Sequence, residues 1–146
     1  YQVNATFFSA LGEDEQKLLL ARAIQMFMPG IPQVWYLDIF AGKNDYEAAD
    51  KGGSAGHKEI NRKTLSMQDI EDGLKTDVVK KQLEIIRLRN TSKAFSGTVK
   101  ISTTSNIELD ILWTNENESA HLKANLQNRA FTISYLENDL SKIMTF

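Results

Sequence analysis

One stretch of the chain, residues 55–66, gathers side chains that could hold an anion or a sugar. Its sequence is AGHKEINRKTLS, with His57, Lys58, Glu59, Asn61 and Arg62 close together. Lysine and arginine form charge-assisted hydrogen bonds to phosphate oxygens, and amide groups can bind sugar hydroxyls. A solvated, charged loop would have a similar composition. The chemistry of this stretch therefore depends on the elements that position it.

The composition narrows the kinds of partner that the chain could bind. The 146 residues carry a formal charge of -2, which gives no basic field for nucleic acid or for an anionic membrane. A small, neutral or anionic metabolite fits this charge better. There is no cysteine, which excludes disulfides and thiolate chemistry and is compatible with a reducing compartment. The two histidines, His57 and His121, are too far apart in sequence to predict a histidine-based metal site.

The ends and the hydropathy of the chain lead to two further expectations. No apolar run approaches the roughly 20 residues that span a bilayer, and the first residues lack the layout of a signal peptide. We therefore expect a cytoplasmic location. The chain begins at Tyr1 and enters at once into YQVNATFF, so we also expect it to be a fragment of a longer protein.

The elements before the stretch resemble half of a βαβ unit. Residues 9–30 have the marks of a helix, with Glu13, Asp14 and Glu15 where a helix dipole favours negative charge. Its apolar residues surround much of the circumference, which predicts burial on more than one side. Residues 33–40, QVWYLDIF, then predict a strand buried on both faces, with Trp35 and Tyr36 as packing residues.

The rest of the chain divides into a loop, a helix and a β-rich region. Residues 41–66 form a long polar loop with several glycines, and loops of this length in compact domains are usually functional or disordered. Residues 77–90 predict an amphipathic helix with Thr76 as its N-cap. Residues 95–146 alternate apolar with polar positions, which predicts a small antiparallel β-domain. The fold class is therefore α/β plus all-β, divided into residues 1–94 and 95–146.

Three stretches together carry a family resemblance: YQVNATFFSALGEDE, LLLARAIQMFMPGIPQVWYLDIFAGKND and EINRKTLS. They resemble the sucrose phosphorylases and their close relatives in the α-amylase superfamily. The resemblance implies that residues 1–94 are the last βα units of a (β/α)8 barrel and that residues 95–146 are its C-terminal domain. Active sites of such barrels lie at the C-terminal ends of the strands, so residues 41–66 would overhang the substrate pocket.

The resemblance also implies which residues bind substrate. In this family the loop at Tyr1 and Gln2 belongs to a pocket that alternates between fructose and phosphate. A second motif reads Gly-Arg-Asp-Ile-Asn-Arg, and its first arginine helps to bind phosphate; Lys58 takes that place here and lacks the bidentate fork of arginine. The resulting set of predicted substrate-binding and phosphate-binding residues is Tyr1, Gln2, Asp38, His57, Lys58, Glu59, Asn61 and Arg62.

Family members cleave an α-glucoside by the retaining two-carboxylate route and pass the glucosyl group to phosphate, giving α-glucose 1-phosphate. The resemblance implies a sugar and inorganic phosphate as partners and no cofactor. It places the catalytic carboxylates upstream of Tyr1, so we expect no catalytic residue in this chain and no activity of the chain alone. We expect the isolated chain to self-associate, or to need the missing part of the barrel, because its strand would have exposed edges.

Two points of the function stay open at this stage. Lys58 and Asp38, which replaces the usual glycine, depart from the sucrose phosphorylase pattern, so sucrose 6-phosphate, glucosylglycerate and glucosylglycerol are alternatives to sucrose. A non-catalytic carbohydrate-binding or interaction module is the other class of function. Trp113 and Tyr135 could form a stacking platform for it, but aromatic residues in small β-domains are usually core, and His121 is expected at the surface.

Overall fold

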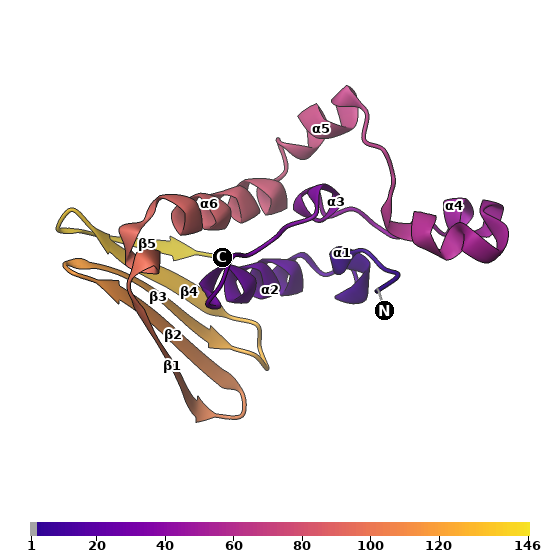
Figure 1. Cartoon of the computed structure of the whole chain (residues 1–146). Helices are drawn as coiled ribbons and strands as arrows, with labels where there is room; N and C mark the ends of the chain where they lie inside the picture. Colours follow the sequence, from indigo (N-terminus) through magenta and orange to yellow (C-terminus); the bar gives the residue numbers. More distant parts are fainter. Residues whose placement is uncertain (1–2) are drawn as a thin grey trace. The chain divides into compact units, whose positions relative to one another are not determined.

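A computed structural model describes residues 3–146 of the chain (Figure 1). The chain forms two compact units. The first unit is made of Gln33–Leu83 and of the segment that ends at Leu18. The second unit is made of Leu19–Pro32 and Glu84–Phe146. Two long helices, α2 (Glu15–Phe27) and α6 (Asp77–Thr91), contribute residues to both units.

The first unit is built mainly from short helices: α1 (Phe7–Ala10), α3 (Tyr36–Ile39), α4 (Tyr46–Lys51), the 3-10 segment η1 (Gly53–Asn61) and α5 (Met67–Gly73). Its buried apolar residues are few and include Phe8, Leu37, Ile60 and Val79. The buried Gln82 on α6 donates from Nε2 to the carbonyl of Ile39 at 2.8 Å. Polar contacts therefore supplement a small apolar core.

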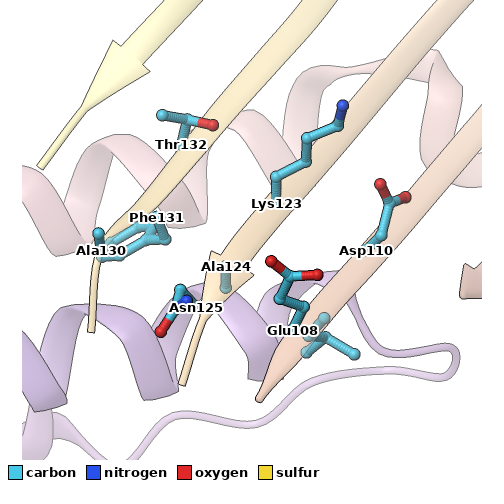
Figure 2. Close-up of a pocket in the computed structure, with 9 residues that line it drawn as sticks. Glu108, Asp110, Lys123, Ala124, Asn125, Ala130, Phe131 and Thr132 are labelled. Carbon is cyan, nitrogen blue, oxygen red and sulfur yellow. The ribbon is translucent and has the colours of Figure 1, made fainter. Parts of the chain in front are cut away.

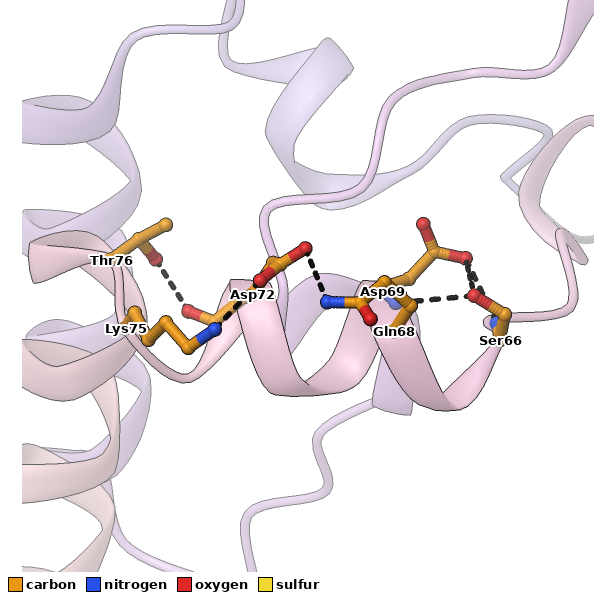
Figure 3. Close-up of polar contacts among 7 residues, drawn as sticks. Ser66, Gln68, Asp69, Asp72, Lys75 and Thr76 are labelled. Atoms are coloured by element: carbon orange, nitrogen blue, oxygen red, sulfur yellow. Dashed lines mark hydrogen bonds and ion pairs between the residues drawn. The ribbon is translucent and has the colours of Figure 1, made fainter.

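Side-chain caps start three of these short helices. Thr6 accepts a hydrogen bond from the backbone of Ser9 at the start of α1, and Asp45 accepts one from Ala48 at the start of α4. Ser66 and Asp69 form a reciprocal capping box on α5 (Figure 3). Such caps satisfy backbone N–H groups that have no partner within the helix.

A five-stranded antiparallel sheet dominates the second unit. Its strands follow one another in chain order across the sheet (Figure 1). They are β1 (Thr98–Ser105), β2 (Glu108–Asn115), β3 (Glu118–Asn125), β4 (Phe131–Glu137) and β5 (Leu140–Thr145). Ile111, Leu122 and Ile133 face one another on adjacent strands, and each is 0% exposed. The antiparallel β-domain that the alternating pattern predicts is confirmed.

An aromatic cluster joins the sheet to the helical residues of the second unit. The indole N–H of Trp113 donates to the carbonyl of Phe27 at 2.7 Å. Phe95, in the 3-10 segment η2 (Lys93–Ser96), contacts both the Phe27 ring and the Trp113 ring. The Arg89 guanidinium lies 4.6 Å from the centre of the Phe95 ring and donates to the carbonyl of Gly30. Burial lowers the pKa of Arg89. Trp113 is thus a core residue, as predicted.

The predicted strand over residues 33–40 is wrong. Residues 36–39 form α3, while Trp35 just before it has an extended backbone with φ -72° and ψ 139°. A strand exists only through its neighbours, and among the described residues every paired strand belongs to the antiparallel sheet. Trp35 and Tyr36 are 52% and 39% exposed, so their assignment as packing residues is also wrong.

The two long helices predicted from the sequence are confirmed, whereas the loop predicted over residues 41–66 is not. Both predicted helices exist as α2 and α6, and residues 41–66 contain α4 and η1 where a loop without regular structure was predicted. None of the described helices is long and apolar enough to cross a membrane. The α/β plus all-β fold class is confirmed, whereas the boundary between residues 94 and 95 stays a prediction.

Candidate functional site

Three side chains from different elements of the first unit converge on the backbone of Ala5–Phe7. Asp38 lies in α3, Asn44 precedes α4, and Asn61 is the last residue of η1. The hydrogen bonds join Thr6 N to Asn44 Oδ1 at 2.7 Å, Phe7 N to Asp38 Oδ1 at 2.9 Å, and Asn61 Nδ2 to Ala5 O at 3.3 Å. Two of the predicted site residues, Asp38 and Asn61, therefore meet on one short segment.

The remaining predicted residues of the second motif lie on η1 and at its end. Glu59 and Arg62 form an ion pair with 3.6 Å between Oε1 and Nη1, and both side chains are about half exposed. His57 is exposed and Lys58 is partly buried. Among residues 3–146, neither the His57 nor the Lys58 side chain has a hydrogen-bond or ion-pair partner. The Lys58 ammonium is therefore the available cation in this motif.

The aromatic residues before α3 tie it to the end of η1. The indole N–H of Trp35 donates to the carbonyl of Asn61 at 3.1 Å, and the Tyr36 hydroxyl donates to the carbonyl of Lys63 at 2.7 Å. Trp35 and Asp38, with Gln33 and Val34, line a hollow of about 640 Å³. Sequence reasoning missed Trp35 as a candidate because it placed the ring inside a strand buried on both faces.

Asn44 is a second residue that sequence reasoning missed. Its backbone N–H donates to Ser9 Oγ at 3.0 Å, and its Nδ2 donates to the Tyr46 hydroxyl at 3.1 Å. A hollow of about 620 Å³ beside it is lined by Lys43, Tyr46 and Lys63, among others. The only sequence signal for Asn44 is its place in AGKND, one of the stretches that carry the family resemblance.

Lys43, next to Asn44, forms an ion pair with Glu13. The Lys43 ammonium lies 2.6 Å from a carboxylate oxygen of Glu13, and its hydrogen bond is the main cause of a lowered pKa of Glu13. Tyr1 and Gln2, the other predicted site residues, lie outside the described residues. Within residues 3–146 no group of three or more His, Cys, Asp or Glu side chains could hold a metal ion.

The sheet of the second unit carries a separate pocket of about 460 Å³ (Figure 2). Figure 2 shows Glu108 and Asp110 on β2 near Lys123 on β3. The aromatic ring among its lining residues, Phe131, is only 4% exposed. His121 is partly buried and its Nε2 lies 2.8 Å from Asp110 Oδ1. Of the two residues considered for a stacking platform, Trp113 is buried, whereas Tyr135 is partly buried with the Lys142 ammonium 5.5 Å from its ring centre.

Two known proteins are similar to this chain in sequence over nearly all of its length. It is 53% identical over 146 residues to the sucrose 6(F)-phosphate phosphorylase of Ilumatobacter coccineus, covering 100% of the chain and 28% of that protein. It is 40% identical over 141 residues to the sucrose phosphorylase of Streptococcus mutans, covering 95% of the chain and 29% of that protein. No family model matches the chain.

A solved structure agrees with these relatives. The crystal structure of sucrose 6F-phosphate phosphorylase from Thermoanaerobacter thermosaccharolyticum matches with a TM-score of 0.92 and 37% identity, covering 100% of the chain and 30% of that protein. The resemblance drawn from the sequence is therefore confirmed. Over its whole length the chain is similar to part of the sucrose phosphorylases and sucrose 6(F)-phosphate phosphorylases, and it spans about 28% of the length of these relatives.

Proposed function

We propose that the whole protein is an α-glucosyl phosphorylase that transfers the glucosyl group of sucrose 6-phosphate or sucrose to phosphate and releases α-glucose 1-phosphate. The observation that carries the proposal is the 53% identity to a sucrose 6(F)-phosphate phosphorylase over the entire chain. In this proposal the chain supplies one wall of the pocket that takes phosphate and the leaving sugar.

The motif at His57–Arg62 is the proposed phosphate-binding part of that wall. Lys58 has no partner among residues 3–146, so its ammonium can donate to a phosphate oxygen without breaking an existing ion pair. Arg62 shares its charge with Glu59 at 3.6 Å, which leaves it a weaker donor to substrate. His57 is exposed beside Lys58 and supplies a further nitrogen donor.

The reaction itself follows the retaining two-carboxylate route in this proposal. A carboxylate attacks the anomeric carbon while a carboxylic acid protonates the leaving sugar, and phosphate then displaces the carboxylate from the glucosyl group. These carboxyl groups lie in the remainder of the whole protein. The residues of this chain bind and orient phosphate and the leaving sugar, so the isolated chain is inactive.

Two observations favour a phosphorylated sugar as the substrate. Identity to one sucrose 6(F)-phosphate phosphorylase is 53%, whereas identity to a second is 37% and to the sucrose phosphorylase 40%, so this observation rests on the first of these relatives alone. His57, Lys58 and the nearby Lys63 also supply more nitrogen donors than one inorganic phosphate needs. Sucrose, glucosylglycerate and glucosylglycerol remain the alternatives that the assay has to separate.

The assay measures glucose 1-phosphate released by the whole protein from each of the four glucosides, with and without inorganic phosphate. We expect the highest kcat/KM with sucrose 6-phosphate and little glucose release when phosphate is omitted. A preference for sucrose would overturn the phosphorylated substrate but keep the reaction type. Equal turnover with water in place of phosphate would overturn the phosphorylase itself.

We also propose that the isolated chain self-associates. Trp35 and Tyr36 are 52% and 39% exposed, and exposed aromatic surface of this kind promotes association. Light scattering of the isolated chain over a dilution series tests this. A strictly monomeric chain with a cooperative unfolding transition would contradict it.

A further inference from the structure

We propose that Asn44, Asp38 and Asn61 form a clamp that fixes the segment Ala5–Phe7 against η1, the element that carries Lys58, and so positions the proposed phosphate-binding motif. Asn44 is the centre of this clamp. The functional part of the inference rests on the proposed phosphorylase activity, whereas the clamp itself is a property of the fold.

The contacts of Asn44 account for its central role. Its Oδ1 accepts from the N–H of Thr6 at 2.7 Å, and its own N–H donates to Ser9 Oγ at 3.0 Å. Thr6 is 1% exposed, so water does not compete for this bond as it would at the surface. One asparagine therefore binds the residue before α1 and a residue within α1.

Asp38 and Asn61 extend the clamp to the elements that carry the predicted site. Asp38, in α3, accepts a hydrogen bond from the N–H of Phe7. Asn61, at the end of η1, donates one to the carbonyl of Ala5. The carbonyl of Asn61 in turn accepts from the Trp35 indole. A displacement of Ala5–Phe7 would therefore displace the end of η1, three residues beyond Lys58.

The clamp changes the role expected of two predicted site residues. The resemblance led us to expect that Asp38 and Asn61 contact substrate, but one oxygen of Asp38 and the amide nitrogen of Asn61 are bonded to backbone. We therefore assign both as positioning residues.

Hydrogen exchange in the whole protein tests the clamp without reference to activity. Asn44→Ala removes the acceptor for the N–H of Thr6, so exchange at that amide should become roughly 3- to 10-fold faster, the equivalent of one lost hydrogen bond. Asn44→Asp keeps an acceptor oxygen there and should exchange like the wild type. Asn90→Ala, at an exposed asparagine on α6, is the matched control. Unchanged exchange at Thr6 in Asn44→Ala would overturn the clamp.

Steady-state kinetics of the same variants test the coupling to the pocket. We expect Asn44→Ala to raise the KM for phosphate roughly 5- to 10-fold at nearly constant kcat, and Asn44→Asp to restore it. A purely structural role would instead lower kcat for phosphate and for water in parallel with Tm, and would overturn the coupling. If the wild type releases no glucose 1-phosphate, the proposed function fails, while the exchange result still decides the clamp.

Discussion

Different kinds of contact stabilise each of the two compact units internally. In the second unit, a continuous antiparallel ladder carries a row of fully buried aliphatic residues across β2, β3 and β4. In the first unit, short helices are joined by hydrogen bonds from side chains to backbone, such as those of Asn44 and Asp38. The residues proposed for phosphate binding therefore lie in the unit where single polar contacts, rather than a large apolar core, determine position.

The largest expected effect comes from the apolar row of the sheet. Leu122 is 0% exposed at the centre of β3, so Leu122→Ala should destabilise the whole protein by about 2–5 kcal/mol through lost burial and a cavity. Ile143→Ala is the matched control, because Ile143 is 69% exposed on β5 and its truncation should cost less than about 0.5 kcal/mol. Urea unfolding followed by circular dichroism measures both. Similar costs for the two variants would mean that the sheet is not held by its buried face.

Two glycine-to-alanine substitutions test how closely the elements of the first unit pack. A Cβ at Gly56 would lie 1.9 Å from the carbonyl oxygen of Ala49, so Gly56→Ala has to separate η1 from α4, at a cost of about 3 kcal/mol. Gly53 has a φ of +58° but open space around it, so Gly53→Ala should cost only about 1 kcal/mol. Thermal unfolding compares the two, and a larger loss for Gly53→Ala would contradict the packing of η1 on α4.

The fold of the second unit was predictable from the sequence because its signals are periodic. The alternation through residues 95–146 depends only on which residues face the core, and the structure keeps that pattern in Ile111, Leu122 and Ile133. The apolar stripe of α6 is likewise a periodic signal that depends only on which residues face the core. The strand predicted at residues 33–40 failed because strand formation depends on partners that an apolar run cannot specify.

The candidate site was predictable only in part. Residue types singled out the His57–Arg62 motif, and the structure pairs Glu59 with Arg62 there. The bonds from Asn44, Asp38 and Asn61 to Ala5–Phe7 join residues more than 30 positions apart, and no local pattern encodes them. The caps of α4 and α5 did leave a signal, since Asp45 and the Ser66–Asp69 pair are typical of helix starts.

The smallest expected effect is a pH dependence of α5. The hydrogen bond from Lys75, followed by that from Gln68, lowers the pKa of Asp72 below its ordinary value of 3.8 (Figure 3). A carboxyl group with a lowered folded-state pKa contributes stability above its unfolded pKa and loses it as the pH falls through the folded pKa. The contribution of Asp72 should thus disappear below the ordinary pKa. Lys75→Ala should raise the pKa of Asp72 in an NMR titration, and an unchanged pKa would contradict this ion pair.

Lys58 on η1 is the proposed phosphate ligand, and the KM for phosphate of Lys58→Ala in the whole protein measures this role. Loss of a charge-assisted hydrogen bond worth about 1.5–3 kcal/mol should raise this KM by one to two orders of magnitude. Lys80→Ala, at an exposed lysine on α6, is the control and should leave the KM unchanged. An unchanged KM for phosphate in Lys58→Ala, together with weaker binding of the sugar, would show that Lys58 contacts the sugar and not phosphate.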